Sequence, residues 1–286
     1  MLLEDFNTDN RYAAKVIKST RITPLESSEE VRELVLQFKA HNFEPKIGQT
    51  IGVIVPGNQD FGTENHFRLY TIAAFSEKQK NKLFEITICV KRCSYIDDFS
   101  GEEFKGVASN YLCDLKTQDQ LTLTGPYGHP FEVPEEHDAD LLLIGLGTGI
   151  APFRAFVKNI YQNIGNWQGK VRLFYGAKSG LEMLYMNDER DDFANYYDEE
   201  TFKAFKAVSP RPHWEVPVAL DEALQAHQAE VWDMICQSNT HVYIAGLATI
   251  NETLDKVFSQ FAGSAEKWRR KKAELVAGKR WMELIY

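Results

Sequence analysis

The stretch "LLLIGLGTGIAPFRAF" (residues 141–156) decides the fold of the second half of the chain. It opens with a continuous apolar run, which is typical of a strand buried on both faces of a parallel sheet. Gly145, Gly147 and Gly149 follow, and glycine lets a backbone approach a ligand closely. Pro152 lies where the first turn of a helix tolerates proline. The stretch therefore predicts a strand, a turn and a helix whose first N–H groups can hold an anion.

This turn alone leaves two interpretations open. Its spacing is G-x-G-x-G, whereas the dinucleotide-binding fingerprint is G-x-G-x-x-G. A phosphate-binding loop and a plain tight turn are both compatible with these glycines, so the rest of the chain has to decide between them.

Strands and helices alternate through the second half. Strands are predicted at 140–147, 170–177, 240–248 and 280–286, and the segment 200–209 is predicted to pass from helix into strand. Helices are predicted at 151–164, 220–237, 250–263 and 267–278. Alternation at this pace predicts a parallel sheet with crossover helices.

The first half has a different rhythm. Short strands with near period-two alternation, many of them bounded by Gly, Pro, Asn or Asp, are predicted at 12–20, 30–38, 50–57, 68–75, 82–92 and 119–128. Such a series predicts an antiparallel barrel or sandwich. The segment 129–140 contains prolines and acidic residues between two apolar runs and is the predicted linker. We therefore expect domains at 1–134 and 135–286.

Composition narrows the class further. At 286 residues two domains are expected, and the net charge of -9 argues against general nucleic-acid binding. The 4 cysteines are too few for a disulfide scaffold, and they lack metal-ligand spacing. No apolar run approaches the roughly 18 residues of a membrane span, and the acidic N-terminus does not resemble a signal peptide. We expect a cytoplasmic protein without a metal site or membrane association.

Five features occur in one order along the chain. They are "RLYT" (68–71), "CVKR" (89–92), "KGVASNYLCDL" (105–115), "GTGIAPFR" (147–154) and the C-terminal tyrosine. This set resembles the plant-type ferredoxin–NADP(+) reductase family. The resemblance implies an N-terminal antiparallel six-stranded β-barrel that carries FAD. It also implies a C-terminal Rossmann-like parallel α/β domain that carries NADP(H).

The resemblance assigns flavin contacts to the first three motifs. The guanidinium of Arg68 matches the geometry of a pyrophosphate, and Tyr70 can stack on one face of the flavin ring. Thr71 offers a hydroxyl near N5, where family members usually have serine, and Ser109 can hydrogen-bond the pyrophosphate. The expected flavin contacts are Arg68, Leu69, Tyr70, Thr71, Cys89, Val90, Lys91, Gly106, Val107, Ala108 and Ser109.

The resemblance also assigns the NADP(H) contacts, which lie in the second half of the chain. Ser209 and Arg211 in "AVSPR" match the Ser-x-Arg that would hold the 2′-phosphate, although the lysine and tyrosine that often follow are missing. Ala245 replaces the usual cysteine beside the nicotinamide. The expected NADP(H) contacts are Gly147, Thr148, Gly149, Ser209, Arg211, Gly246, Leu247 and Tyr286.

The ending "RWMELIY" raises the question of a catalytic acid. Tyr286 is expected to cover the flavin face opposite Tyr70 and to move aside for the nicotinamide. The family commonly ends Trp-x-x-Glu-x-Tyr, but here Glu283 comes one position early. A shift of one residue turns a strand side chain to the other face unless a bulge corrects it. The expected catalytic residues are Thr71, Tyr286 and, as a candidate proton relay, Glu283.

The resemblance implies a monomeric FAD-dependent reductase. It would transfer electrons between NADP(H) and an acidic one-electron carrier, a ferredoxin or flavodoxin, by hydride transfer between nicotinamide C4 and flavin N5. One alternative is the reductase component of an oxygenase or epoxidase system, because residues 174–205 and 209–224 resemble reductase modules of aerobic benzoyl-CoA pathways. A non-catalytic flavoprotein is the other alternative. The basic run 267–272 could face the acidic partner or be ordinary solvated surface.

Overall fold

The computed structural model describes residues 5–41, 43–57, 64–78, 82–97, 99–197, 199–209 and 219–286. The chain divides into two compact units, Met1–Pro130 and Phe131–Tyr286. The division falls inside the predicted linker 129–140, a little before the domain boundary expected after residue 134. Each unit is built around its own buried apolar core.

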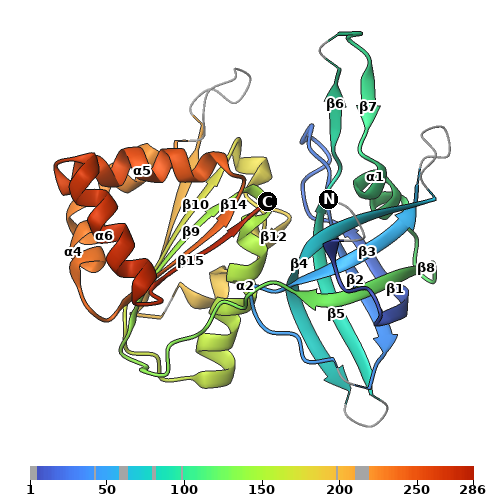
Figure 1. The fold of residues 1–286 in the computed structure, drawn as a ribbon, viewed down its shortest axis with the longest axis horizontal. Coiled ribbons are helices and arrows are strands. Elements are labelled where there is room, and N and C mark those ends of the chain that lie inside the picture. The colour runs from blue at the N-terminus through green and yellow to red at the C-terminus, as the bar shows by residue number, and fades with distance from the viewer. Residues whose placement is uncertain are drawn as a thin grey trace. The chain divides into compact units, whose positions relative to one another are not determined.

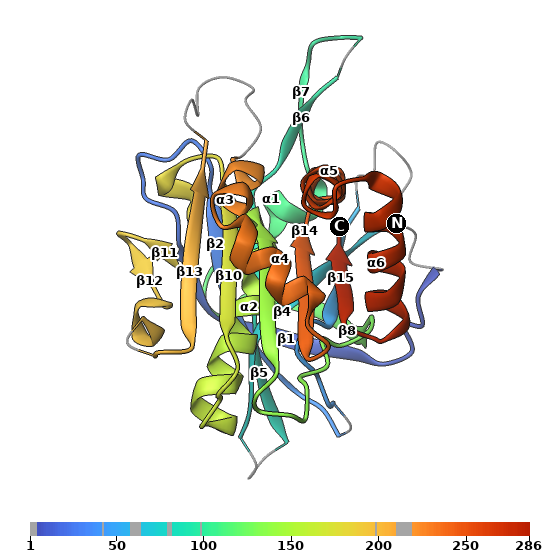
Figure 2. The ribbon, with the colours of Figure 1, turned by 90° about the vertical axis from the view of Figure 1, so that its left-hand side faces the viewer.

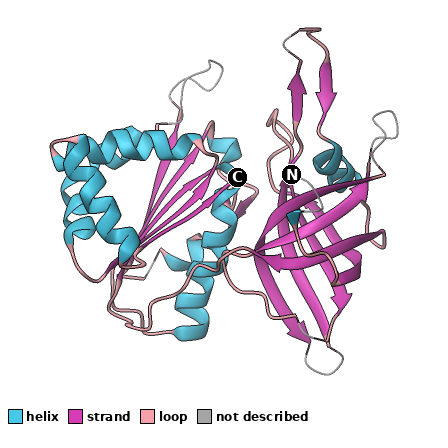
Figure 3. Ribbon diagram, in the orientation of Figure 1, coloured by secondary structure: helices cyan, strands magenta, loops and turns pink. Residues whose placement is uncertain are grey.

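The N-terminal unit is a closed barrel with the strand order β1-β2-β5-β4-β3-β8. Its neighbouring strands are all antiparallel. Figures 1 and 3 show these strands wrapped around a common interior. The predicted six-stranded antiparallel barrel is therefore confirmed. Its strands are β1 (Arg11–Arg21), β2 (Val31–Lys39), β3 (Thr50–Pro56), β4 (Asn65–Lys78), β5 (Leu83–Lys91) and β8 (Gln120–Tyr127).

The barrel interior is filled by the inward-facing side chains, which are every second residue of each strand. Leu34, Leu36 and Phe38 of β2 are all buried in one core, because every second residue of a strand faces the same side. Helix α1 (Val107–Asp114) adds Leu112 and Cys113 to that core. A small hairpin, β6 (Ser94–Ile96) and β7 (Glu103–Lys105), leads from β5 to α1 and extends away from the barrel (Figure 1). The sequence did not predict this hairpin.

The C-terminal unit contains a parallel sheet with the order β13-β10-β9-β14-β15. Figure 2 shows the strands of this sheet side by side. The predicted parallel α/β domain is therefore confirmed. Its strands are β9 (Asp140–Leu146), β10 (Val171–Ala177), β13 (Phe202–Val208), β14 (Thr240–Gly246) and β15 (Trp281–Ile285).

Helices cover both faces of the sheet (Figures 1 and 2). Helix α2 (Ile150–Lys158) packs on one face, where the rings of Phe156 and Tyr243 are 4.7 Å apart. The opposite face shares a core with α3 (Leu220–Ala226), α4 (Gln228–Cys236), α5 (Thr249–Ala262) and α6 (Ala265–Ala277). Two details of the prediction were wrong: the helix 220–237 is divided at His227, whose backbone is not helical, and the segment 200–209 contains only a strand.

Shorter elements complete this unit. A 3-10 turn (Gly147–Gly149) joins β9 to α2, and a π-helical segment (Asn159–Ile164) follows α2. Further 3-10 turns (Gly180–Glu182 and Ala194–Tyr196) flank the hairpin of β11 (Met186–Asn187) and β12 (Arg190–Asp191). Among the helices of the described residues, none is long and apolar enough to cross a membrane.

Candidate cofactor-binding sites

Strand β4 carries the first group of expected flavin contacts. It pairs with β3 without interruption from Asn65 to Thr71, so Arg68 and Tyr70 share one face and Leu69 and Thr71 the other. Arg68 is exposed, whereas Tyr70 packs against the barrel core. Burial, and then the nearby Cys113 and Cys93, raise the pKa of Tyr70, while Arg68 acts in the opposite direction. Tyr70 and α1 both pack against the barrel core, and Arg68 lies two residues before Tyr70 on the same face of β4.

The start of α1 is built for an anion. No side chain caps the helix, and its first turn contains no acidic residue. A Cβ atom on Gly106 would lie 2.8 Å from Ser109 Oγ and 3.2 Å from the Cys93 carbonyl oxygen, so only glycine fits without a shift. Ser109 Oγ accepts a hydrogen bond from the Cys93 N–H at 3.2 Å. Val107, Ala108 and Ser109 thus form an uncapped helix start behind a close backbone turn, which suits a pyrophosphate.

The expected contacts on β5 have different orientations. Cys89 and Val90 are buried, Val90 within the barrel core, so contact with a flavin would have to use their backbone atoms. Lys91 is exposed and forms an ion pair with Glu29 at 2.9 Å. The charge of Lys91 is therefore available at the surface but shared with a carboxylate of the connection that precedes β2.

The loop between β9 and α2 is packed tightly against the end of β14. A Cβ atom on Gly149 would lie 2.0 Å from the carbonyl oxygen of Ala245, which is backbone and cannot turn aside. Gly147 has a φ of +57°, a conformation that favours glycine. Tyr175 donates a hydrogen bond to the Gly147 carbonyl at 2.9 Å. These constraints account for the two glycines and leave the helix start without a side-chain cap.

The C-terminal tyrosine reaches this loop. Strand β15 pairs in parallel with β14, and the Tyr286 N–H donates to the Gly246 carbonyl at 3.1 Å. The hydroxyls of Tyr286 and Thr148 are 2.5 Å apart and hydrogen-bonded. The side chain of Tyr286 is nevertheless half exposed, as is that of Leu247. Four of the expected nicotinamide contacts, Thr148, Gly246, Leu247 and Tyr286, therefore gather around the ends of β14 and β15.

Glu283 lies among structural partners instead. The pairing of β14 with β15 runs from Val242↔Trp281 to Gly246↔Ile285 without a bulge, so nothing restores the family register. Its carboxylate accepts hydrogen bonds from Trp281 Nε1 at 2.5 Å and Asn251 Nδ2 at 3.3 Å. Lys272 Nζ lies 3.6 Å away. These contacts attach β15 to α5 and α6 and give Glu283 an anchoring role, while the proton-relay role stays an untested prediction.

The expected 2′-phosphate pair is described only in part. Ser209 directly follows β13 and is buried, with 4% of its surface exposed. Arg211 lies outside the described residues. The pairing of these two residues around a phosphate therefore stays a prediction.

Two charged groups were missed by the sequence reading. Arg92, the last residue of the "CVKR" motif, is bonded to Glu30, Asn110 and Asp114. Arg154 of "GTGIAPFR" pairs with Asp192, which also binds Arg190 at 2.7 Å. Burial alone would raise the pKa of Asp192, but the two arginines hold it below its usual value. Both arginines stand in quoted motifs, but their partners are distant in sequence and no local pattern identifies them.

Comparison with known proteins agrees with this division of the chain. Residues 16–131 match the model of the oxidoreductase FAD-binding domain, and residues 143–256 match that of the oxidoreductase NAD-binding domain. The leaf isozyme 1 ferredoxin–NADP reductase of Oryza sativa subsp. indica is 30% identical over 282 residues, covering 96% of this chain and 76% of the relative. The chain belongs to the ferredoxin–NADP reductase family.

Other members of the family align over nearly the whole chain. The chloroplastic ferredoxin–NADP reductase of Spinacia oleracea is 29% identical over 98% of this chain and 77% of the relative. The ferredoxin–NADP reductase of Spirulina sp is 28% identical over 96% of this chain and 95% of the relative. The solved ferredoxin–NADP+ reductase of Plasmodium falciparum has the same fold, with a TM-score of 0.72, 21% identity and 98% coverage of both chains.

Proposed function

We propose that this protein is an FAD-dependent reductase that transfers electrons between NADP(H) and a ferredoxin. The observation that carries the proposal is that each unit presents an uncapped, glycine-bounded helix start, α1 in one and α2 in the other. Each start lies within the matched FAD-binding or NAD-binding domain of the family. A helix start of this kind binds the phosphate groups that FAD and NADP(H) both carry.

On the flavin side, the residues of this chain would bind and orient FAD. Arg68 and the amides of Val107, Ala108 and Ser109 would hold the pyrophosphate, Tyr70 would pack on the ring, and Thr71 would place a hydroxyl at its edge. When bound, FAD supplies the redox chemistry, because it takes up a hydride and passes electrons on singly.

On the nicotinamide side, the loop at Gly147, Thr148 and Gly149 would hold the pyrophosphate. Ser209 and Arg211 would recognise the 2′-phosphate that distinguishes NADP(H) from NAD(H). Gly246 and Leu247 would border the nicotinamide, and Tyr286 would occupy its place until the nucleotide binds. Ala245 and Leu284 bring neither a thiol nor a carboxylate, so the role we propose for the residues here is to position the nicotinamide.

A reduction assay tests the proposal. The purified protein is expected to be yellow, to lose its flavin absorbance when NADPH is added without oxygen, and to reduce a ferredoxin. A yellow protein that NADPH cannot bleach would contradict the reductase and favour a non-catalytic flavoprotein. Parallel assays with a flavodoxin and with the iron–sulfur component of an oxygenase distinguish the carriers. The cytoplasmic location and the monomeric state stay predictions that fractionation and light scattering check.

A further inference from the structure

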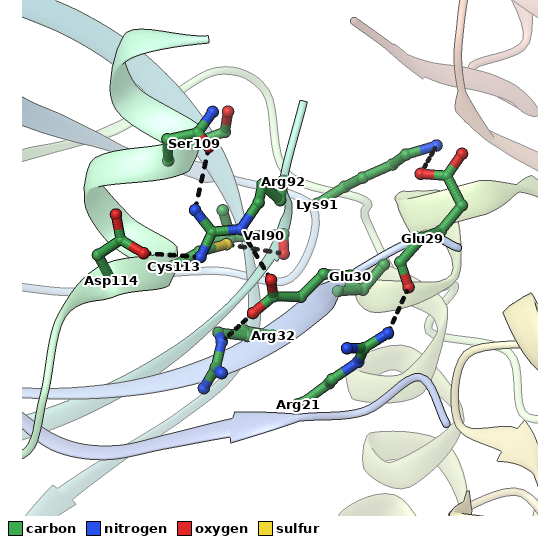
Figure 4. Close-up of polar contacts among 12 residues, drawn as sticks. Arg21, Glu29, Glu30, Arg32, Val90, Lys91, Arg92, Ser109, Cys113 and Asp114 are labelled. Atoms are coloured by element: carbon green, nitrogen blue, oxygen red, sulfur yellow. Dashed lines mark hydrogen bonds and ion pairs between the residues drawn. The ribbon is translucent and has the colours of Figure 1, made fainter. Parts of the chain in front are cut away.

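The guanidinium of Arg92 lies at the centre of a charged cluster beside α1. Its Nε donates to Glu30 Oε2 at 2.7 Å, and its Nη2 donates to Asp114 Oδ1 at 2.8 Å. Its Nη1 donates to Asn110 Oδ1 at 3.0 Å. Figure 4 shows Arg92 between Glu30 and Asp114. Each nitrogen of the guanidinium therefore already has an acceptor within the protein.

The residue that follows Arg92 is attached to the very start of α1. The Cys93 N–H donates to Ser109 Oγ at 3.2 Å, and the Cys93 carbonyl accepts from the Gly106 N–H at 2.9 Å. That carbonyl also accepts from Asn110 Nδ2 at 2.8 Å. These bonds fix the position of the helix start.

The orientation of α1 is fixed only when the helix is held at two places, and Arg92 provides the second attachment. Asn110 and Asp114 are one helical turn apart and therefore lie on the same side of α1. The guanidinium bonds to both, so it fixes the direction of the helix axis while Cys93 fixes its origin. The free N–H groups of a helix start point along that axis. The direction of α1 consequently decides where the amides of residues 107–109 point.

Glu30 anchors this arrangement to the barrel. It immediately precedes β2, and its carbonyl accepts the Arg92 N–H at 2.8 Å. Its carboxylate binds Arg92 through one oxygen and Arg32 Nε, at 2.5 Å, through the other. Arg32 bonds to Glu30 and Ser19 but makes no hydrogen bond or ion pair with α1 among the described residues. The two arginines share one carboxylate, and only Arg92 connects it to the helix.

We propose that Arg92 is a positioning residue for the flavin pyrophosphate: it orients α1 so that the amides of residues 107–109 face the phosphates, without contacting the cofactor. The inference rests on the proposed function, because it takes the start of α1 as the FAD-phosphate site. Lysine cannot reproduce the effect, since a single ammonium group lacks the fork that serves Glu30, Asn110 and Asp114 together.

The test compares Arg92→Lys with Arg32→Lys in protein freed of flavin. Titration with FAD, followed by flavin fluorescence, gives the dissociation constants. We expect Arg92→Lys to weaken FAD binding by about tenfold, because a misdirected helix start loses well-placed phosphate contacts. Arg32→Lys makes the same chemical change on the same carboxylate, and we expect it to leave the constant within about twofold of wild type.

Riboflavin, which lacks the phosphates, distinguishes positioning from general loosening of the barrel. If Arg92 orients the phosphate site, Arg92→Lys weakens FAD but not riboflavin. Equal weakening of both flavins, or equal effects of the two arginine variants, would overturn the proposal. Asp114→Ala removes one exposed helix contact of Arg92 and should shift FAD affinity in the same direction if Arg92→Lys fails to fold. A wild-type protein that binds no FAD would overturn the proposed function and this inference together, whereas FAD binding that ignores Arg92 overturns only the inference.

Discussion

Tyr286 is bonded to the loop that we propose to hold the NADP(H) pyrophosphate. Its hydroxyl is 2.5 Å from that of Thr148, and its backbone N–H is held by Gly246. If the nicotinamide binds where we propose, a ring held at this place would compete with it for the same space. The competition would lower affinity for the nucleotide as a whole and make the 2′-phosphate contacts decisive.

We therefore expect Tyr286→Ser to tighten NADP⁺ binding by about tenfold, or ~1.4 kcal/mol, and to relax selection against NAD⁺. Equilibrium titration with both nucleotides measures this. Tyr286→Phe is the control, because it keeps the ring and removes the hydroxyl that bonds to Thr148. Unchanged affinities in Tyr286→Ser would rule out the gate.

A second prediction for a single residue concerns Arg211. A guanidinium that binds a phosphate contributes to NADPH but has nothing to bind on NADH. Arg211→Ala should accordingly raise KM for NADPH by about tenfold and leave KM for NADH nearly unchanged. Steady-state kinetics with both nucleotides measure these KM values. Equal effects on KM for NADPH and for NADH would contradict the assignment of Arg211 to the 2′-phosphate.

Among the elements, the helix α2 depends on its contact with β14. Because the Cβ of an alanine at position 149 would lie 2.0 Å from the Ala245 carbonyl oxygen, the helix would have to move away from the strand. We expect Gly149→Ala to lower the free energy of unfolding of the C-terminal unit by more than about 2 kcal/mol. Gly180→Ala is the matched control, since nothing lies within 4 Å of its Cβ and we expect a change below about 0.5 kcal/mol. Denaturant unfolding compares the two, and similar stabilities would contradict the packing argument.

The attachment of β15 yields a test of Glu283. Glu283 and Asp255 are comparable carboxylates: each accepts an indole N–H, from Trp281 and Trp268, and each lies near Lys272. Only Glu283 belongs to the terminal strand. A proton-relay acid contributes about 100-fold or more to the rate, whereas an anchoring carboxylate of this exposure contributes at most about 1 kcal/mol of stability.

We expect Glu283→Gln to lower stability slightly and to change kcat far less than a lost relay would. Asp255→Asn should lower stability by a similar amount and leave kcat unchanged. Turnover and thermal unfolding of both variants measure these effects. A 100-fold loss of kcat confined to Glu283→Gln would restore the relay assignment.

For the molecule as a whole, charge is the property that bears on an acidic partner. The net charge is -9, yet α6 presents Lys267, Arg269, Arg270, Lys271 and Lys272. The last three are paired with Glu266, Glu274 and Asp255 respectively. Lys267 and Arg269 are exposed and form no ion pair within the described residues, so any attraction by this helix depends mainly on them.

We expect the rate of ferredoxin reduction to fall as salt is added, because ions screen the attraction over about 10 Å at 0.1 M. Arg269→Glu should lower kcat/KM for ferredoxin, while Lys15→Glu, an equal change of charge on exposed β1, should not. Stopped-flow rates over a range of ionic strength provide the measurement. Rates that ignore salt, or that fall equally in both variants, would exclude α6 as the docking face.

Local patterns in the sequence were sufficient for an antiparallel β unit followed by a parallel α/β unit, while the choice of a barrel over a sandwich came from the family resemblance. A strand buried on one face alternates apolar and polar residues, as the barrel strands do. A strand buried on both faces is apolar throughout, as β9 is. The same locality explains the errors: the ring of His227, where the helix divides, lies 4.0 Å from that of Phe205 on β13, a contact that no local pattern shows, and the hairpin of β6 and β7 is too short to show a period.

Some residues of the candidate sites could be named from the sequence, and others only from the tertiary structure. The glycines could be named from the sequence pattern, and Arg68, Tyr70 and the C-terminal tyrosine from the family resemblance of short motifs. The tertiary structure alone decided that Glu283 serves Trp281 and Asn251, that Tyr286 reaches Thr148, and that Arg92 joins Glu30 to α1. The physical reason is that hydrogen bonds and ion pairs form between atoms that meet in space, and Arg92 and Glu30 meet only where β2 pairs with β5.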